Sequence, residues 1–163
     1  MPESVPSPIS SQEQRSRLLR IRRLAKTLGF KGLVEYRHVV GNSGGAQYGI
    51  GSTSDQDLLV VFADAFERDA DPNDFSLEAI LAHERGHQLI VWHSKLSRIL
   101  ARGIELVSEE ILASLIGSLI VEREQDRRDL YHKALYEAVA HGIDSTHAIR
   151  LLHELRLLLE KAL

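Results

Sequence analysis

Residues 80–91 read ILAHERGHQLIV and contain the pattern H-E-x-x-H at His83, Glu84 and His87. Two histidines four positions apart lie on one face of a helix, one turn above the other. Both imidazoles can then reach a single metal ion, and the glutamate beside them can take a proton from a water on that ion. The pattern therefore predicts His83 and His87 as zinc ligands and Glu84 as a general base.

The residues around the motif favour a buried helix, because apolar residues stand on both sides of it. The sequence DPND at 71–74 marks a loop. We therefore expect the helix to begin behind Asp74 or Ser76 as N-cap and to run to about His93. Gly86 inside a helix costs about 1 kcal/mol relative to alanine, which indicates that another backbone or a substrate approaches it closely.

A catalytic zinc site needs a third protein ligand beside the two histidines. The chain has no cysteine, so this ligand has to be His, Asp or Glu. On a helix expected over about 105–122, Glu110 shares a face with small residues, which lets a second helix come close. Glu110 is therefore favoured, with Glu109 and Glu105 as alternatives. The two adjacent glutamates are otherwise explained as an acidic helix start behind Ser108 as cap.

The remaining sequence predicts an α+β protein, with a short sheet before the motif helix and a helical C-terminal half. Residues 1–14, rich in proline and serine, are expected to be a disordered leader, and residues 15–163 a single domain. Helices are expected over about 15–28, 126–141 and from 144 or 145 to the C-terminus. Strands are expected over 33–40 and 58–63, with a hairpin around 46–50.

Composition excludes several classes of partner. The formal net charge is −3, so we expect no nucleic acid, and the basic residues of 15–28 are interpreted as a solvated helix face. No apolar run reaches the roughly 18 residues of a membrane-spanning helix, so we expect no membrane partner. The first residues lack the pattern of a signal peptide, which predicts a cytoplasmic protein.

The H-E-x-x-H motif is followed about twenty residues later by E-x-x-A at 110–113, and this pair resembles the gluzincin arrangement. HERGH, with glycine before the second histidine, resembles the H-E-L-G-H of the ImmA/IrrE-type metallopeptidases. Those are small bacterial and phage-associated cytoplasmic proteins in which a short sheet precedes the active-site helix. The resemblance covers about residues 33–122, and Arg85 stands where that family usually has an apolar residue. It implies a zincin-like fold with His83, His87 and Glu110 as zinc ligands and Glu84 as base.

As a zinc metallopeptidase of this kind, the chain would hydrolyse a peptide or protein substrate. An extended substrate would pair with a strand near 46–50 or 58–63. A donor to the anionic oxygen would come from the helix that follows the ligand helix, with Tyr131, His132, Tyr136 and His141 as the residues considered. The alternatives are a non-enzymatic regulator with a structural zinc ion and a helical interaction domain without metal. The leucine-rich stretch 148–163 predicts either core or a homodimer face.

Overall fold

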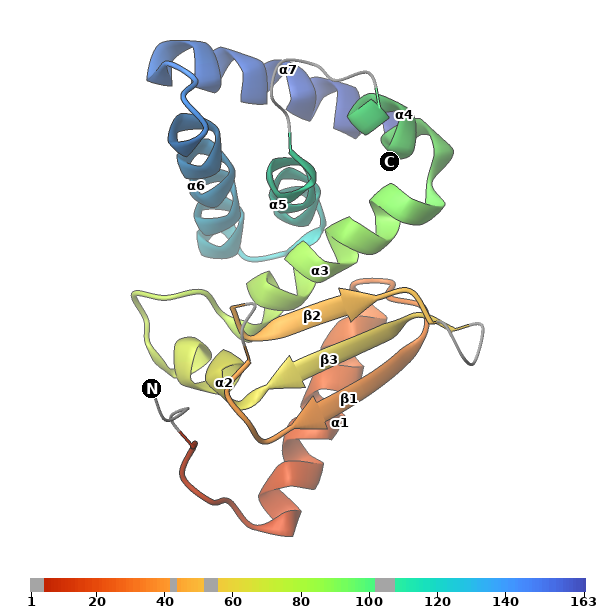
Figure 1. Ribbon diagram of the computed structural model, residues 1–163, viewed down its shortest axis with the longest axis vertical. Coiled ribbons are helices and arrows are strands. Elements are labelled where there is room, and N and C mark those ends of the chain that lie inside the picture. Colours follow the sequence, from red (N-terminus) through yellow and green to blue (C-terminus); the bar gives the residue numbers. More distant parts are fainter. Residues whose placement is uncertain (1–4, 42–43, 52–55, 102–107) are drawn as a thin grey trace.

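The computed structural model describes residues 5–41, 44–51, 56–101 and 108–163. Within these ranges the chain forms seven helices and three strands, an α+β architecture as predicted (Figure 1). In chain order the elements are α1 (Ser11–Thr27), β1 (Leu33–Arg37), β2 (Ala46–Gly49), β3 (Leu58–Phe62), α2 (Ala63–Ala70), α3 (Leu77–Trp92), α4 (Ser94–Ala101), α5 (Glu109–Ile120), α6 (Glu124–Ala140) and α7 (Ser145–Ala162).

The three strands form one sheet in the order β1-β3-β2. The apolar, β-branched strand β3 lies in the centre, where it pairs with β1 in parallel and with β2 in antiparallel orientation. The segment around 46–50, expected to form a hairpin, contains one strand, β2, whose antiparallel partner is β3. Figure 1 shows α1 crossing behind the sheet and α3 running along the side of β2. Both sides of β3 are occupied, so of the two strands considered for a substrate it is β2 that lies at an edge of the sheet.

Helix α3 connects two hydrophobic clusters. Its N-terminal half packs with α1 and the sheet, and Leu77 and Leu81 belong to that cluster together with Ile21 of α1. Its C-terminal half contributes Ile90 to a second cluster, which is built around α5 and includes α6 and α7. Figure 1 shows α5 enclosed by α3, α6 and α7. The sheet half and the helical half therefore meet on the helix that carries the H-E-x-x-H motif.

The ends of the helices follow capping side chains. Helix α1 begins four residues earlier than expected, because Ser10 accepts a hydrogen bond from the backbone N–H of Glu13 at 3.0 Å. This helix takes up the last four residues of the stretch expected to be disordered. Helix α3 begins behind Ser76 as predicted, and α5 begins at Glu109 behind Ser108. Glu105, considered as a ligand, lies outside the described residues.

Helix α7 directs most of its apolar side chains into the molecule. Its buried residues include Leu151, Leu152 and Leu155, whereas Leu157 and Leu158 are 47% and 44% exposed. Most leucines of α7 therefore belong to the core, as one of the two interpretations predicted. A homodimer through the exposed leucines stays a prediction. Among the described residues, none of the helices has both the length and the apolar character that crossing a bilayer requires.

Candidate metal centre

His83 and Glu84 of the H-E-x-x-H motif lie on a buried face of α3. Ser76 caps α3 by accepting from the N–H of Ala79 at 3.1 Å, and its own hydroxyl donates to Asp126 at 2.7 Å. His83 and Glu84 are only 6% and 8% exposed. The cap and its partner on α6 therefore fix the start of the helix at Leu77, less than two turns before His83.

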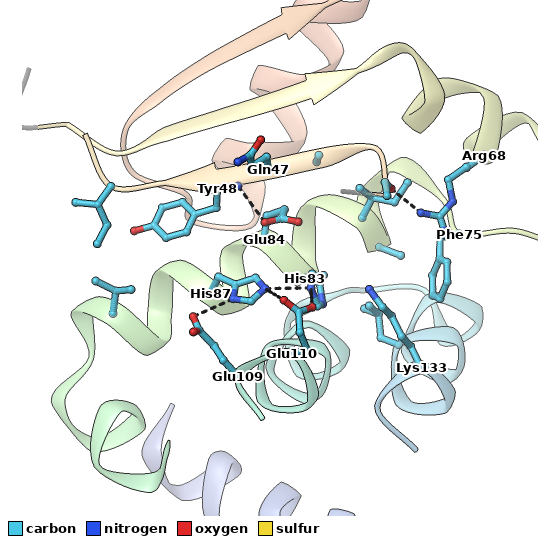
Figure 2. Close-up of a pocket in the computed structure, with 17 residues that line it drawn as sticks. Gln47, Tyr48, Arg68, Phe75, His83, Glu84, His87, Glu109, Glu110 and Lys133 are labelled. Carbon is cyan, nitrogen blue, oxygen red and sulfur yellow. Dashed lines mark hydrogen bonds and ion pairs between the residues drawn. The ribbon is translucent and has the colours of Figure 1, made fainter. Parts of the chain in front are cut away.

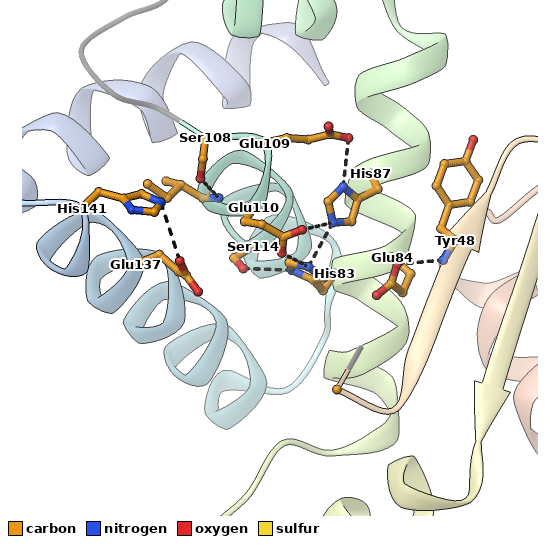
Figure 3. A network of polar contacts seen from close by, with 12 residues as sticks. Tyr48, His83, Glu84, His87, Ser108, Glu109, Glu110, Ser114, Glu137 and His141 are labelled. Carbon is orange, nitrogen blue, oxygen red and sulfur yellow. Dashed lines mark hydrogen bonds and ion pairs between the residues drawn. The ribbon is translucent and has the colours of Figure 1, made fainter. Parts of the chain in front are cut away.

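Three donor groups converge between α3 and α5 (Figure 3). The Nε2 atoms of His83 and His87 lie 3.1 Å apart. The carboxylate of Glu110 reaches both, with Oε2 2.9 Å from Nε2 of His83 and Oε1 3.1 Å from Nε2 of His87. Three ligand atoms on a tetrahedral zinc ion with bonds of about 2.0–2.1 Å are about 3.3 Å apart. The three residues therefore already have nearly the separations that zinc ligands require.

The set of donors also suits zinc by its chemistry. Two imidazoles and one carboxylate are the ligands of several catalytic zinc sites, which keep a fourth position for water. The closest donor atoms of His83, His87 and Glu110 all lie within 4.8 Å of one another. In the described part of the chain, no second group of three such side chains gathers in this way. The residues present therefore fit a zinc ion.

The outer nitrogens of both histidines have partners as well. Nδ1 of His83 lies 2.9 Å from the hydroxyl of Ser114, and Nδ1 of His87 lies 3.0 Å from a carboxylate oxygen of Glu109. Such contacts set the orientation of a metal-binding imidazole and leave its Nε2 directed at the ion. The carboxylate of Glu110 thus contacts both Nε2 atoms. Glu109, the alternative ligand, contacts His87 at Nδ1 instead.

Close helix packing brings Glu110 to the histidines. A Cβ atom on Gly86 would meet the backbone carbonyl oxygen of Ala113 and would lie 2.9 Å from its Cα. On the other helix, a Cβ on Gly117 would lie 3.2 Å from the backbone of Ala82. The close approach expected at Gly86 is therefore confirmed, and the approaching backbone is that of α5. Two glycines let the helices come near enough for a short carboxylate to span the gap.

The protonation states of His83, His87 and Glu110 suit the binding of a cation. Burial lowers the pKa of His83 to about 4, so that its imidazole is neutral near pH 7. Hydrogen bonds with His83 and His87 hold the pKa of Glu110 far below its usual range. Burial opposes the charged form of His87, but hydrogen bonds with Glu110 and Glu109 outweigh it and raise the pKa of this histidine to about 9. A divalent cation would take the place of the proton on His87.

Glu84 lies beside the three donors and is not one of them. Its carboxylate accepts a hydrogen bond from the backbone N–H of Tyr48 in β2 at 3.1 Å. Burial raises the pKa of Glu84 to about 7. A carboxylate with a pKa near neutrality can both take up and release a proton at pH 7, as a general base and acid must.

A cavity of about 570 Å³ opens beside this cluster, between β2 and the helices α3, α5 and α6 (Figure 2). His83, Glu84, His87 and Glu110 all line it. The four residues considered as donors to an anionic oxygen, Tyr131, His132, Tyr136 and His141, are all described, and none of them lines it. The residue of α6 that does reach the cavity, besides the apolar Leu130, is Lys133.

Arg85, unusual for the family that the motif resembles, turns away from the cavity. Its Nε donates to the carbonyl oxygen of Leu28 at 3.2 Å, and its Nη1 donates to Gln88 at 2.6 Å. Arg85 therefore joins α3 to the end of α1, and its charge has a structural explanation that does not involve the metal site.

Comparison of the chain with protein-family models, curated proteins and solved structures gave no significant match. The function of the chain is therefore inferred from the geometry and chemistry of this cavity.

Proposed function

We propose that this protein is a zinc-dependent peptide hydrolase with a zincin-like fold. His83, His87 and Glu110 hold the ion, and Glu84 is the general base. The observation that carries the proposal is the convergence of three ligand-type donors within 4.8 Å of one another, next to a buried carboxylate in the same cavity. The short sheet with its edge strand beside the motif helix supports the choice of fold.

In the proposed reaction the zinc ion and the side chains of the protein have separate roles. Zinc, when bound by His83, His87 and Glu110, would supply a Lewis acid and lower the pKa of water. Glu84 would accept a proton from the attacking water as the water oxygen adds to the peptide carbonyl carbon. Glu84 then gives the proton to the amine nitrogen, so that the C–N bond can break. Ser114 and Glu109 keep the two imidazoles oriented throughout.

The edge strand β2 is the proposed docking site for an extended substrate. The backbone N–H of Tyr48 points away from β3, since it donates to Glu84 on the neighbouring helix. The outer edge of β2 therefore faces the cavity. A peptide laid along this edge would make main-chain hydrogen bonds and bring one of its carbonyl groups to the metal centre.

A structural zinc ion, as in a non-enzymatic regulator, has less support. Structural zinc sites are commonly closed by four protein ligands, whereas catalytic sites leave a position open. Here the described residues supply three donors, and the cavity of about 570 Å³ adjoins them. This arrangement favours a site at which water and a substrate meet.

The proposal is tested with Glu84→Gln and a library of fluorescence-quenched peptides. Glutamine still accepts the hydrogen bond from Tyr48 but takes up no proton. We expect the variant to bind one zinc ion like the wild type and to lose about 10²- to 10⁴-fold in turnover of any peptide that the wild type cleaves. Unchanged turnover with full zinc occupancy would refute the role of Glu84.

A further inference from the structure

Lys133 is a cation within the cavity that has no place in the proposed mechanism so far. It belongs to α6, and its side chain lies beside Phe75, with the amine 5.8 Å from the centre of that ring (Figure 2). Its neighbours face elsewhere, since Tyr131 packs against the helical core and His132 lines an adjoining hollow. Lys133 lines this hollow too, but among the polar residues of α6 it alone also lines the cavity beside the metal centre.

The ammonium group of Lys133 lies near the side chains of the proposed metal centre but forms no ion pair with them. Lys133 lines the same cavity as His83 and Glu84. Burial has the largest effect on the pKa values of these two residues, and the nearby charge of Lys133 adds a smaller effect that favours neutral His83 and ionised Glu84. The ion pairs among the described residues nevertheless leave Lys133 without a carboxylate partner. Arg68, a second cation lining the same cavity, is by contrast paired with Asp74 at 3.0 Å.

A partly buried, unpaired ammonium next to a metal site is costly unless an anion reaches it during function. Lys133, Glu84 and Glu110 line the same cavity of about 570 Å³, and among the described residues Lys133 forms no ion pair with either carboxylate. An oxygen atom that sits between the metal centre and the amine would lie within this cavity. In peptide hydrolysis such an oxygen becomes negatively charged, and a preorganised donor there stabilises the transition state.

We propose that the Lys133 ammonium donates a hydrogen bond to the carbonyl oxygen of the scissile peptide as that oxygen becomes an anion. This inference rests on the proposed function. As water adds to the carbonyl carbon, the π electron pair of the C=O bond moves onto the oxygen next to Lys133. The pair returns when the C–N bond breaks. Lys133 keeps its proton in both steps, while Glu84 carries the transferred proton.

The kinetic test compares Lys133→Met, which keeps the apolar stem, with Lys133→Arg, which keeps the charge. We expect Lys133→Met to lower kcat by about 10²- to 10³-fold with KM nearly unchanged, because the lost contact exists only in the transition state. Lys133→Arg should recover part of this loss. Lys31→Met, which removes a lysine outside the cavity, should behave like the wild type.

A binding test separates this role from activity. Each variant is loaded with cobalt(II) in place of zinc and titrated with acetate, while the visible absorption of the metal reports anions that bind at it. We expect Lys133→Met to bind cobalt like the wild type but acetate about 10-fold more weakly. Lys133→Arg and Lys31→Met should stay close to the wild-type acetate affinity.

Equal acetate affinity in Lys133→Met and the wild type would overturn the inference and leave the metal site intact. A kinetic loss seen only as a higher KM for peptides with acidic side chains would also overturn it, because Lys133 would then bind a substrate carboxylate. Failure of the wild type to bind cobalt would instead refute the metal site itself, and this inference with it.

Discussion

The adjacent residues Glu109 and Glu110 differ by about 100° of rotation around the axis of α5. This rotation directs Glu110 to both Nε2 atoms and Glu109 to the outer nitrogen of His87 alone. The small residues beside Glu110 in the sequence already favoured this choice, because they permit close packing on α3. In the structure Glu110 lies against both Nε2 atoms, and its role as a ligand stays a prediction.

We predict that Glu110→Ala lowers zinc affinity sharply, because a three-ligand site would keep only two protein ligands. Glu109→Ala is the matched control, since it removes a carboxylate one position away that contacts only the back of His87. It should cost at most about 10- to 100-fold in affinity. Competition with a chromogenic zinc chelator measures both values. A larger loss for Glu109→Ala than for Glu110→Ala would reverse the two assignments.

Single-residue contacts between helices were the least predictable part of the site. The contact between His83 and Ser114 joins residues 31 positions apart, and spacing along one helix carries no information about it. Lys133 was missed for a different reason. The sequence of α6 favours its tyrosines and histidines as donors, whereas the packing of that helix places a lysine at the cavity.

At the scale of elements, capping residues made the motif helix predictable. Ser76 caps α3 where expected, and Asp144 likewise caps α7. Helices α2 and α4 were not predicted. Both have eight residues, and α2 follows β3 directly from Phe62, which makes no side-chain capping bond. Tertiary packing stabilises such short helices more than their own sequence does, so local patterns identify them poorly.

The contact between α3 and α5 gives a second prediction. Gly86→Ala should destabilise the protein by about 1–3 kcal/mol, because the new methyl group would meet the backbone of Ala113 and force the helices apart. It should also weaken zinc binding, since Glu110 would move away from the histidines. Urea unfolding of the metal-free protein measures the first effect, and chelator competition measures the second.

Gly117→Ala is the graded control for that experiment. Its methyl group would lie 3.2 Å from the backbone of Ala82, a tight contact that a small shift relieves. Alanine also favours a helix over glycine by about 1 kcal/mol, so the net change in unfolding free energy should be within about 1 kcal/mol of zero. A Gly86→Ala protein as stable as the wild type would mean that α3 and α5 are not held as closely as described.

At the scale of the whole molecule, one buried carboxylate joins the sheet to α3 on the side away from the cavity. Asp57, at the start of β3, accepts hydrogen bonds from Tyr48 at 2.8 Å, Gln88 at 2.9 Å and Trp92 at 2.6 Å. Burial tends to raise the pKa of Asp57, but these hydrogen bonds outweigh it and hold the pKa below its usual value. The same Tyr48 donates its backbone N–H to Glu84, so the network also supports the edge of the cavity.

A pH dependence of stability follows. Because the folded state depresses the pKa of Asp57, the carboxylate stabilises the fold above its unfolded pKa of about 3.9, and this contribution is lost as the pH falls further. In metal-free protein at pH 6, we expect Asp57→Asn to lower the unfolding free energy by about 1–3 kcal/mol. The difference from the wild type should shrink toward pH 3. Urea unfolding at a series of pH values measures it.

The exposed carboxylate of Glu154 provides the control, because Glu154→Gln removes a similar charge from the surface of α7. The unfolding free energy of the Glu154→Gln variant should equal that of the wild type at every pH. A difference between Asp57→Asn and the wild type that stays constant from pH 6 to pH 3 would contradict an ionised Asp57 at the centre of the network.

The central claim is that the chain binds one zinc ion through the H-E-x-x-H helix and Glu110. Its most direct test is the zinc content of the purified protein, measured by elemental analysis for the wild type and for His87→Ala after equal exposure to zinc and removal of the excess. His87 contacts Glu110 and His83 through Nε2, so its loss opens the site without removing a fully buried side chain. We predict about one zinc ion per wild-type chain and close to none in the variant. Equal zinc content in the two proteins, or none in the wild type, would contradict the account.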